Sequence, residues 1–139
     1  MVLICRCFDQ RFALPASQVT RVLGAVQFVS IQHLKGFAVG VVNVAGVNLA
    51  LCDSRLALGL PSATLEPEQR FIEIEGLNQS RRWLLWVDEV VNIISVTQMQ
   101  CDALQVPSAA PVTHTLRLPL ETVPLLDLRV TEPTAVIGD

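Results

Sequence analysis

Lysine, long apolar runs and metal-binding cysteine pairs are scarce or missing in this sequence of 139 residues. Nine of the ten basic residues are arginines, and they are scattered, so a basic surface typical of nucleic-acid-binding proteins is not expected. The longest apolar region, 39–52, is interrupted by Asn43, Gly46 and Asn48 and is shorter than the roughly 18 apolar residues of a membrane span. Residues 1–11 lack the pattern of a signal peptide. We therefore expect a cytoplasmic protein that does not insert into the membrane.

The cysteines and histidines are too widely spaced to predict a metal site. Cys5 and Cys7 are two residues apart, whereas Cys52 and Cys101 stand alone. Zinc sites use C-x2-4-C spacing with a second ligand pair, and the sequence contains no such arrangement. We expect no metal and no cofactor. The thiols are expected to be buried and free, because a reducing compartment disfavours disulfides.

What the sequence does contain is apolar material for a core. Hydrophobic residues make up 51% of the chain and charged residues 17%, a balance that excludes a disordered protein. A chain of this length corresponds to about one domain, 1–139. Few charges and many arginines also indicate that part of the surface is covered by another protein.

Short apolar runs between turn residues predict strands that pair as hairpins. A two-residue link, Ala45-Gly46, supplies the glycine that such a turn needs. Helix is expected only as a turn or two, at 17–23 and after Thr97, and a loop is expected at 61–67. The predicted hairpins pair 39–44 with 47–52, 71–75 with 83–87, 2–7 with 12–14 across Asp9-Gln10, and 116–118 with 123–128.

The sequence also repeats itself. The pattern L-x-D-x-R around Asp53 and Arg55 returns 74 residues later around Asp127 and Arg129. The run that begins at Arg11 is echoed 71 residues later. Each copy holds about five short strands, too few for a stable unit alone, so the copies are expected to share a core.

These patterns predict an all-β fold of two small five-stranded barrels packed around a shared core. The first barrel is expected at about 12–61. The second is expected at about 70–130, together with the N-terminal strand 1–11. Trp83 and Trp86 lie three apart on one strand and face opposite sides, so we expect one in the core and the other exposed for a partner.

Several stretches resemble the CheW-like domain family. They are 12–19 (FALPASQV), 40–55 (GVVNVAGVNLALCDSR), 58–61 (LGLP), 86–90 (WVDEV) and 125–127 (LLD). They follow one another in the family's order over nearly the whole chain.

The resemblance implies a function as well as a fold. Members of this family are non-catalytic adaptors with two five-stranded barrels around a common core. They join the cytoplasmic tip of methyl-accepting chemoreceptors to the regulatory domain of the CheA histidine kinase. By this resemblance, Val19, Gly40, Asn43 and position 45 mark the receptor-facing groove.

The sequence departs from the family at that groove. The first hairpin of family members commonly reads N-L-R-G, with an arginine linked to receptor binding, whereas this chain has Ala45 at that place. The bidentate hydrogen bonds of a guanidinium are therefore absent unless Arg21 or Arg55 replaces them. The alternative function is a divergent scaffold of another kinase pathway that has lost receptor binding.

Enzymatic interpretations are less well supported. Asp53 and Asp127 could form an acid-protease dyad, but the glycine of that motif is missing. Each aspartate is instead expected to accept hydrogen bonds at the end of a strand. Ser17, His33 and Asp53 lack the G-x-S-x-G motif of a hydrolase, and the two histidines are expected in loops.

Overall fold

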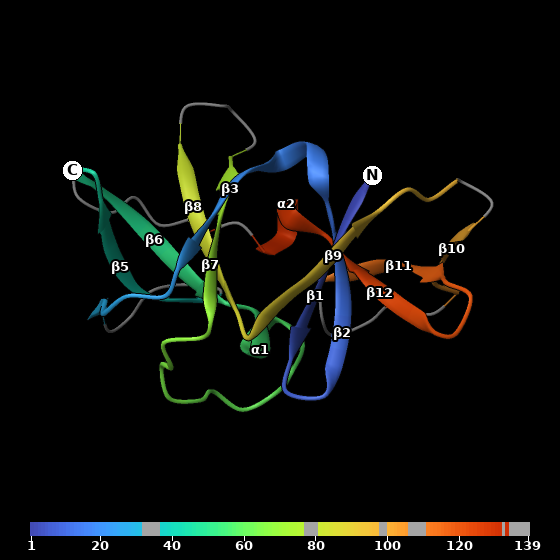
Figure 1. The fold of residues 1–139 in the computed structure, drawn as a ribbon, viewed down its shortest axis with the longest axis horizontal. Helices are drawn as coiled ribbons and strands as arrows, with labels where there is room; N and C mark the ends of the chain where they lie inside the picture. Colours follow the sequence, from blue (N-terminus) through green and yellow to red (C-terminus); the bar gives the residue numbers. More distant parts are fainter. Residues whose placement is uncertain (32–36, 77–80, 98–99, 106–110, 132, 134–139) are drawn as a thin grey trace.

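The computed structural model describes residues 1–31, 37–76, 81–97, 100–105, 111–131 and 133. Nearly all of its regular structure is strand, as the sequence predicts (Figure 1). No helix in these segments is long and apolar enough to cross a membrane. The elements are β1 (Val2–Cys7), β2 (Gln10–Pro15), the 3-10 turn η1 (Ala16–Gln18), β3 (Val19–Gly24), β4 (Val29–Ser30), β5 (Ala38–Val44), β6 (Val47–Asp53), α1 (Ser54–Ala57), β7 (Arg70–Glu75), β8 (Arg82–Val87), β9 (Glu89–Ile94), β10 (Cys101–Ala103), β11 (Val112–Arg117), β12 (Thr122–Leu126) and α2 (Leu128–Thr131).

The strands form two sheets of six, which lie side by side along the long axis (Figure 1). The first sheet has the order β3-β7-β8-β6-β5-β4, and the second has the order β9-β1-β2-β12-β11-β10. The two orders are equivalent when β1 to β6 are matched with β7 to β12. The chain therefore runs through the same unit twice, as the repeated sequence predicts, and each unit ends in a one-turn helix, α1 or α2.

The two units exchange their first hairpins. Hairpin β1–β2 pairs with β12 and β9 of the second unit, and β7–β8 pairs with β6 and β3 of the first. The junctions β6–β8 and β12–β2 are parallel, while the other pairings among the described strands are antiparallel. Sheet membership thus crosses the limits 12–61 and 70–130 expected for the two subdomains.

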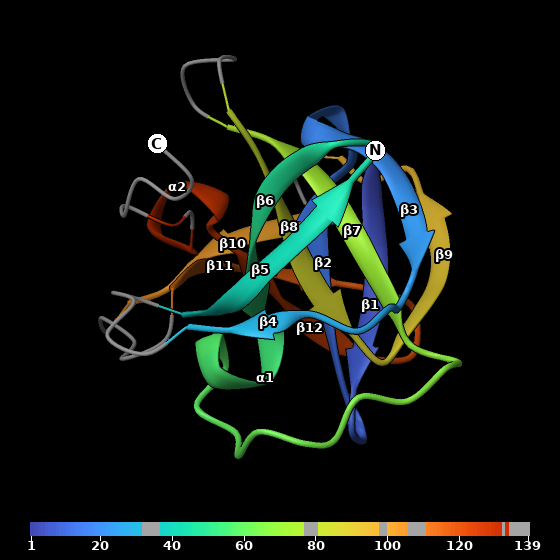
Figure 2. The ribbon, with the colours of Figure 1, turned by 90° about the vertical axis from the view of Figure 1, so that its left-hand side faces the viewer.

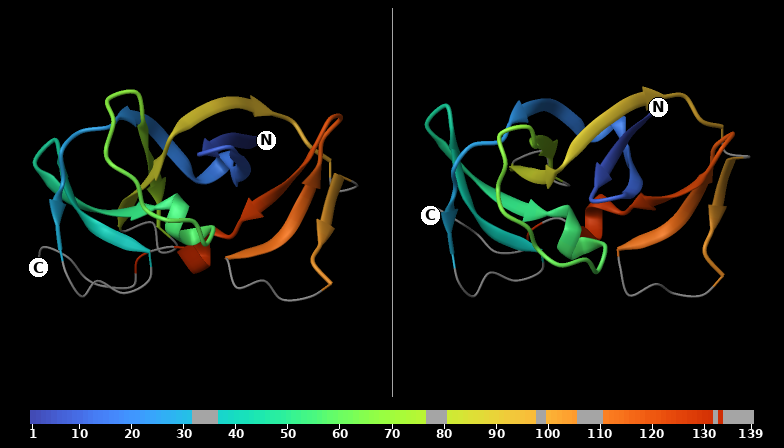
Figure 3. Two further views of the ribbon diagram at one scale, coloured as in Figure 1. Left: turned by 90° about the horizontal axis from the view of Figure 1, so that it is seen from below. Right: turned by 60° about the horizontal axis from the view of Figure 1, so that its bottom comes forward.

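The expectation of two closed five-stranded barrels is wrong in strand number and in closure. Each sheet gains two strands from the other unit. Among the described residues the edge strands β3 and β4, or β9 and β10, are not paired with each other. Each sheet is strongly curved, as the views from below and from the side show (Figures 2 and 3), and its unpaired edge strands leave it open. The short helices lie between the two sheets (Figure 3).

Three apolar clusters hold the sheets together, and the exchanged hairpins contribute to all of them. Alternate residues of β8 show the arrangement: Trp83 and Leu85 enter the cluster shared by both sheets, whereas Leu84 and Trp86 fill the inside of the first sheet. Strand β1 divides its side chains in the same way between the shared cluster and the second sheet. The shared core expected from the sequence is present.

The two tryptophans face opposite sides of β8, but the expectation that one is exposed is wrong. Trp83 is 3% exposed and Trp86 is 2% exposed. The reason is the position of β8, which lies between β7 and β6 and is covered on both faces. Neither indole is available to a partner.

The predicted hairpins are present, with shifts in the first and the last of them: the last joins β11 and β12 through 118–121, because Arg117 pairs with Thr122. The first turn is made by Phe8 and Asp9, because Cys7 pairs with Gln10. Segment 17–23 is not helical beyond η1. It forms β3, because its backbone pairs with β7 along the edge of the sheet. The helix expected after Thr97 involves residues outside the described ranges.

The cysteine prediction is confirmed for three of the four side chains. Cys5, Cys7 and Cys52 are free and buried, whereas Cys101 is free but only half-buried on the edge strand β10. Burial raises the pKa of the Cys7 thiol to about 11, so this group stays protonated at neutral pH. No group of three potential metal ligands is found within the described segments.

Candidate functional site: the junction of the two sheets

Strand β6 ends at Asp53, whose side chain starts α1. One Asp53 oxygen accepts a hydrogen bond from the backbone N–H of Arg55 at 2.9 Å, which caps the helix. The other oxygen accepts from the Ser62 hydroxyl at 3.2 Å. The expected hydrogen bonding at the end of a strand is confirmed here and at Asp127, which accepts from the N–H of Arg129 at 3.0 Å.

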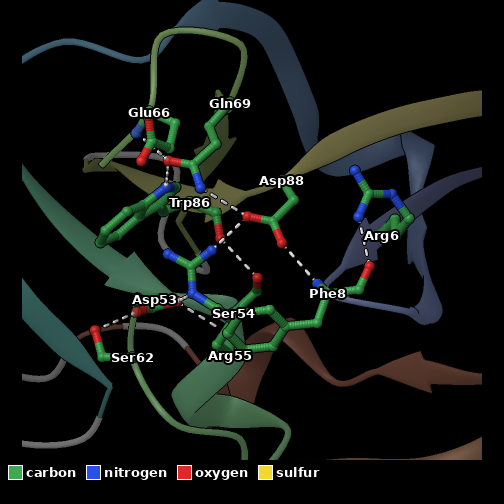
Figure 4. A network of polar contacts seen from close by, with 10 residues as sticks. All are labelled: Arg6, Phe8, Asp53, Ser54, Arg55, Ser62, Glu66, Gln69, Trp86 and Asp88. Carbon is green, nitrogen blue, oxygen red and sulfur yellow. Dashed lines mark hydrogen bonds and ion pairs between the residues drawn. The ribbon is translucent and has the colours of Figure 1, made fainter. Parts of the chain in front are cut away.

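Arg55 is the largest fully buried side chain of the described structure. Its guanidinium lies 3.2 Å from Asp53 and 2.5 Å from an oxygen of Asp88 (Figure 4). The Arg55 Cζ atom is 4.2 Å from the centre of the Trp86 ring and 5.6 Å from that of Phe8. Two carboxylates and two aromatic rings thus surround one cation and partly compensate for its loss of water, since Nε and Nη2 make no hydrogen bond within the described structure.

Asp88 connects this cation to both sheets. Its Oδ2 accepts the backbone N–H of Phe8, in the β1–β2 turn of the second sheet, at 2.6 Å. Its Oδ1 also accepts from the Gln69 amide at 2.8 Å, and Gln69 in turn accepts from the Trp86 indole at 2.9 Å (Figure 4). The network therefore joins the turn of the second sheet to α1 and β8 of the first.

Burial has the largest effect on the Asp53 carboxyl group. Removal from water raises the pKa of Asp53, and the nearby charge and backbone N–H of Arg55 only partly oppose this effect. The backbone of Phe8 is strained as well, because its φ of 54° lies in the left-handed region. Its N–H contact with Asp88 and its carbonyl contact with Arg6, at 2.5 Å, hold it there.

A groove of about 410 Å³ opens beside this network, between the two sheets. Asp88 contributes to its wall, so the buried network and the groove share a side chain. Charged groups dominate the lining, and the apolar residues come from β3 and β9. The lining residues are Arg6, Val22, Glu68, Arg70, Asp88, Glu89 and Val90.

The four residues expected at a receptor-facing groove lie on the first sheet, but not all together. Asn43 and Ala45 are exposed at the tip of the β5–β6 hairpin, and Gly40 is buried further along β5. Val19 is half-buried at the start of β3. Strand β3 is the edge strand at the opposite side of the sheet from β4 and β5.

Two of these residues have a structural task in the fold. A Cβ atom at Gly40 would lie 2.4 Å from the Val29 carbonyl oxygen, so only glycine lets β4 lie this close to β5. The Asn43 side chain accepts from the N–H of Gly46 at 3.1 Å and thereby shapes the turn. Ala45 adopts a φ of 51°, with its side chain in the exposed turn.

The two arginines considered as replacements for a cation at position 45 differ in accessibility. Arg55 is fully buried and holds Asp53 and Asp88, so it cannot reach a partner. The Arg21 side chain is 49% exposed and is paired with Glu73. Of these two arginines, only Arg21 is available at the surface.

The described residues do not bring together the side chains of the acid-protease alternative. Asp53 and Asp127 each cap their own one-turn helix, at the ends of strands β6 and β12 in different sheets. His33 lies outside the described residues, and His114 is on strand β11 rather than in a loop.

Sequence reasoning did not identify Asp88 and Gln69 as members of a site. The signal for Asp88 was its place directly after the apolar strand β8, within the WVDEV stretch. Gln69 precedes β7 without a distinguishing pattern, so only the fold reveals its contacts.

Comparison with known proteins places this two-sheet architecture in a family. The model of the CheW-like domain matches residues 1–131, and the chain belongs to the CheW-like domain family. No curated relative matches the chain in sequence.

A solved structure has the same fold. The crystal structure of the scaffolding protein TtCheW from Thermoanaerobacter tengcongensis superposes with a TM-score of 0.82 at 18% sequence identity. The match covers 96% of this chain and 92% of that one. The resemblance inferred from the sequence is thus confirmed at the level of family and fold.

Proposed function

We propose that this protein is a cytoplasmic, non-catalytic adaptor of a chemotaxis-type signalling complex. It binds the regulatory domain of a CheA-type histidine kinase and the cytoplasmic tip of a chemoreceptor at the same time. The observation that carries the proposal is membership of the CheW-like family over residues 1–131. A fold of two sheets fixed by one buried network suits such a role, because an adaptor must hold two partners in a constant relative position.

The receptor site is proposed on the first sheet, whereas the groove between the two sheets is lined by other residues. Asn43 and Ala45 form the exposed tip, Val19 lies on β3, and Gly40 supports the site by letting β4 approach β5. These positions come from the family resemblance, and their contacts in this chain are compatible with the assignment. The kinase domain is proposed to occupy a different surface.

The test is a titration of the protein with a kinase regulatory domain and with a receptor-tip fragment from the same cell. We expect dissociation constants in the micromolar range, about −8 kcal/mol, and a ternary complex on size-exclusion chromatography. No complex with either partner at about a hundred micromolar, some hundredfold above those constants, contradicts the proposal.

A scaffold that has lost receptor binding is the second candidate, and Ala45 is the observation that favours it. Arginine at this exposed turn would restore a guanidinium with its charge-assisted hydrogen bonds. Under the main proposal, Ala45→Arg strengthens receptor binding by about tenfold or more and leaves kinase binding unchanged. Kinase binding without any receptor binding, in both the wild type and this variant, supports the second candidate.

A further inference from the structure

Glu73 is a carboxylate buried on β7 that two arginines share. Its side chain is 1% exposed. Arg21, from the neighbouring strand β3, donates from Nε and Nη2 at 3.2 and 3.1 Å to the two oxygens of Glu73. Arg82, at the start of β8, donates from Nη1 at 3.5 Å to one of them. A buried carboxylate thus fixes guanidinium groups on both neighbouring strands.

The charges of this cluster do not cancel. The bidentate pair of Glu73 with Arg21 satisfies the carboxylate by itself, because both oxygens accept a charge-assisted hydrogen bond. Arg82 adds a second positive charge through one longer contact. The exposed Glu75 lies opposite Arg82 in the strand register but forms no ion pair with it among the described contacts. Arg21, Glu73 and Arg82 by themselves therefore carry one excess positive charge, beside the exposed Glu75, on a chain with a net charge of −3.

The excess charge faces the solvent. The side chains of Arg21 and Arg82 are 49% and 54% exposed. Within the described structure their hydrogen bonds all go to Glu73, so Nη1 of Arg21 and two nitrogens of Arg82 have donors to spare. Arg21 also lies on an edge strand, since β3 pairs only with β7 in the described sheet. An incoming chain can approach these donors without displacing a strand.

We propose that the Arg21–Glu73–Arg82 cluster receives an acidic side chain of the protein partner that docks on the first sheet. This inference rests on the adaptor function proposed above and assigns the contact to the receptor tip. The bidentate pair with Glu73 fixes the Arg21 guanidinium, and one longer contact keeps Arg82 beside it, so a second carboxylate meets two neighbouring guanidiniums at a reduced entropic cost. The cluster thereby supplies the cation that the β5–β6 tip lacks at Ala45.

Arg82→Ala is the primary test, because it removes the excess cation and leaves the pair of Arg21 and Glu73 intact. We expect receptor-tip binding to weaken about tenfold at low salt, and more in Arg82→Glu, where the new charge repels the acidic partner. The difference should shrink at high salt, since the contact is partly exposed. Kinase binding should not change.

Arg11→Ala is the matched control. Arg11 is 46% exposed and paired with Glu121 in the second sheet, so its removal costs a similar surface ion pair away from the proposed contact. We expect it to leave receptor affinity unchanged. Circular dichroism verifies that each variant is folded.

The outcomes separate the two proposals. Wild-type binding to the receptor tip that Arg82→Ala and Arg82→Glu leave unaltered overturns the cluster assignment and leaves the adaptor function standing. Equal losses in Arg11→Ala and Arg82→Ala also overturn it, because they indicate a general charge effect. A wild-type protein that binds neither partner overturns both proposals.

Discussion

The two L-x-D-x-R turns share one local geometry and have opposite surroundings. In each, the aspartate accepts the N–H of the arginine two residues later. Arg55 is nevertheless fully buried, whereas the Arg129 side chain is 70% exposed and contacts only its own Asp127 among the described partners. The same five-residue pattern therefore gives a structural cation in one unit and a surface cation in the other.

The strand that lies next to each turn explains the difference. Beside Arg55, strand β8 supplies the Trp86 ring and is followed by Asp88. The matching positions in the other unit, 71 residues earlier beside β2, are Pro15 and Ser17, which offer neither an aromatic face nor a carboxylate. A guanidinium without such partners is better solvated than buried. The L-x-D-x-R motif determines that the aspartate caps the helix. The strand of the exchanged hairpin determines whether the arginine of the motif is buried or exposed.

Arg55→Met should have the largest effect on this comparison. It leaves Asp53 and Asp88 buried without their cation, a loss that typically costs about 3–5 kcal/mol of unfolding free energy. The equivalent Arg129→Met removes an exposed group and should cost less than about 0.5 kcal/mol. Urea denaturation of both variants measures the difference. Equal effects would mean that the two turns are energetically alike.

Gly40→Ala extends the comparison of the two units to the matching strands β5 and β11. The new Cβ atom meets the backbone oxygen of Val29, so β4 must move away, and we expect a loss of about 1–3 kcal/mol. The matching residue 74 positions later is His114, on the more open β11. His114→Ala should change stability by less than about 0.5 kcal/mol. Thermal unfolding followed by circular dichroism is sufficient, and an unaffected Gly40 variant would contradict the close approach of β4.

The pH dependence of Asp53→Asn probes the burial of the first turn. The pKa of Asp53 is raised in the folded state, so its protonation adds stability that is complete below the ordinary value of 3.8 and is lost as pH rises through the folded pKa. The wild type gains this stability on acidification, and the asparagine variant cannot. The penalty of the substitution should therefore be larger near pH 4 than at pH 7. A penalty that is independent of pH would contradict the raised pKa.

Ala45→Gly should give the smallest effect, and it should be stabilising. Alanine at a φ of 51° is strained, whereas glycine adopts this conformation without a steric penalty. We expect a gain of no more than about 1 kcal/mol in unfolding free energy, reduced by the greater freedom of glycine in the unfolded chain. A destabilised variant would show that the turn does not hold this backbone conformation.

The hairpins, the tandem repeat and the family were all predictable from local patterns. Apolar runs on either side of Ala45-Gly46 specify a turn, and the two strands that it joins pair because they are neighbours in sequence. The capping roles of Asp53 and Asp127 follow in the same way from residues two positions apart. Such features depend on a few adjacent residues, which is why the sequence alone determines them.

Only the tertiary structure decided that both strands of each first hairpin join the sheet of the other unit, and which turn is buried. Hairpins β1–β2 and β7–β8 are apolar on both faces, so their own patterns fit either sheet equally well. Their placement depends on the parallel pairings β12–β2 and β6–β8, between strands far apart in the chain. The burial of Arg55 follows from that placement, because Trp86 and Asp88 reach it only when β8 lies beside β6.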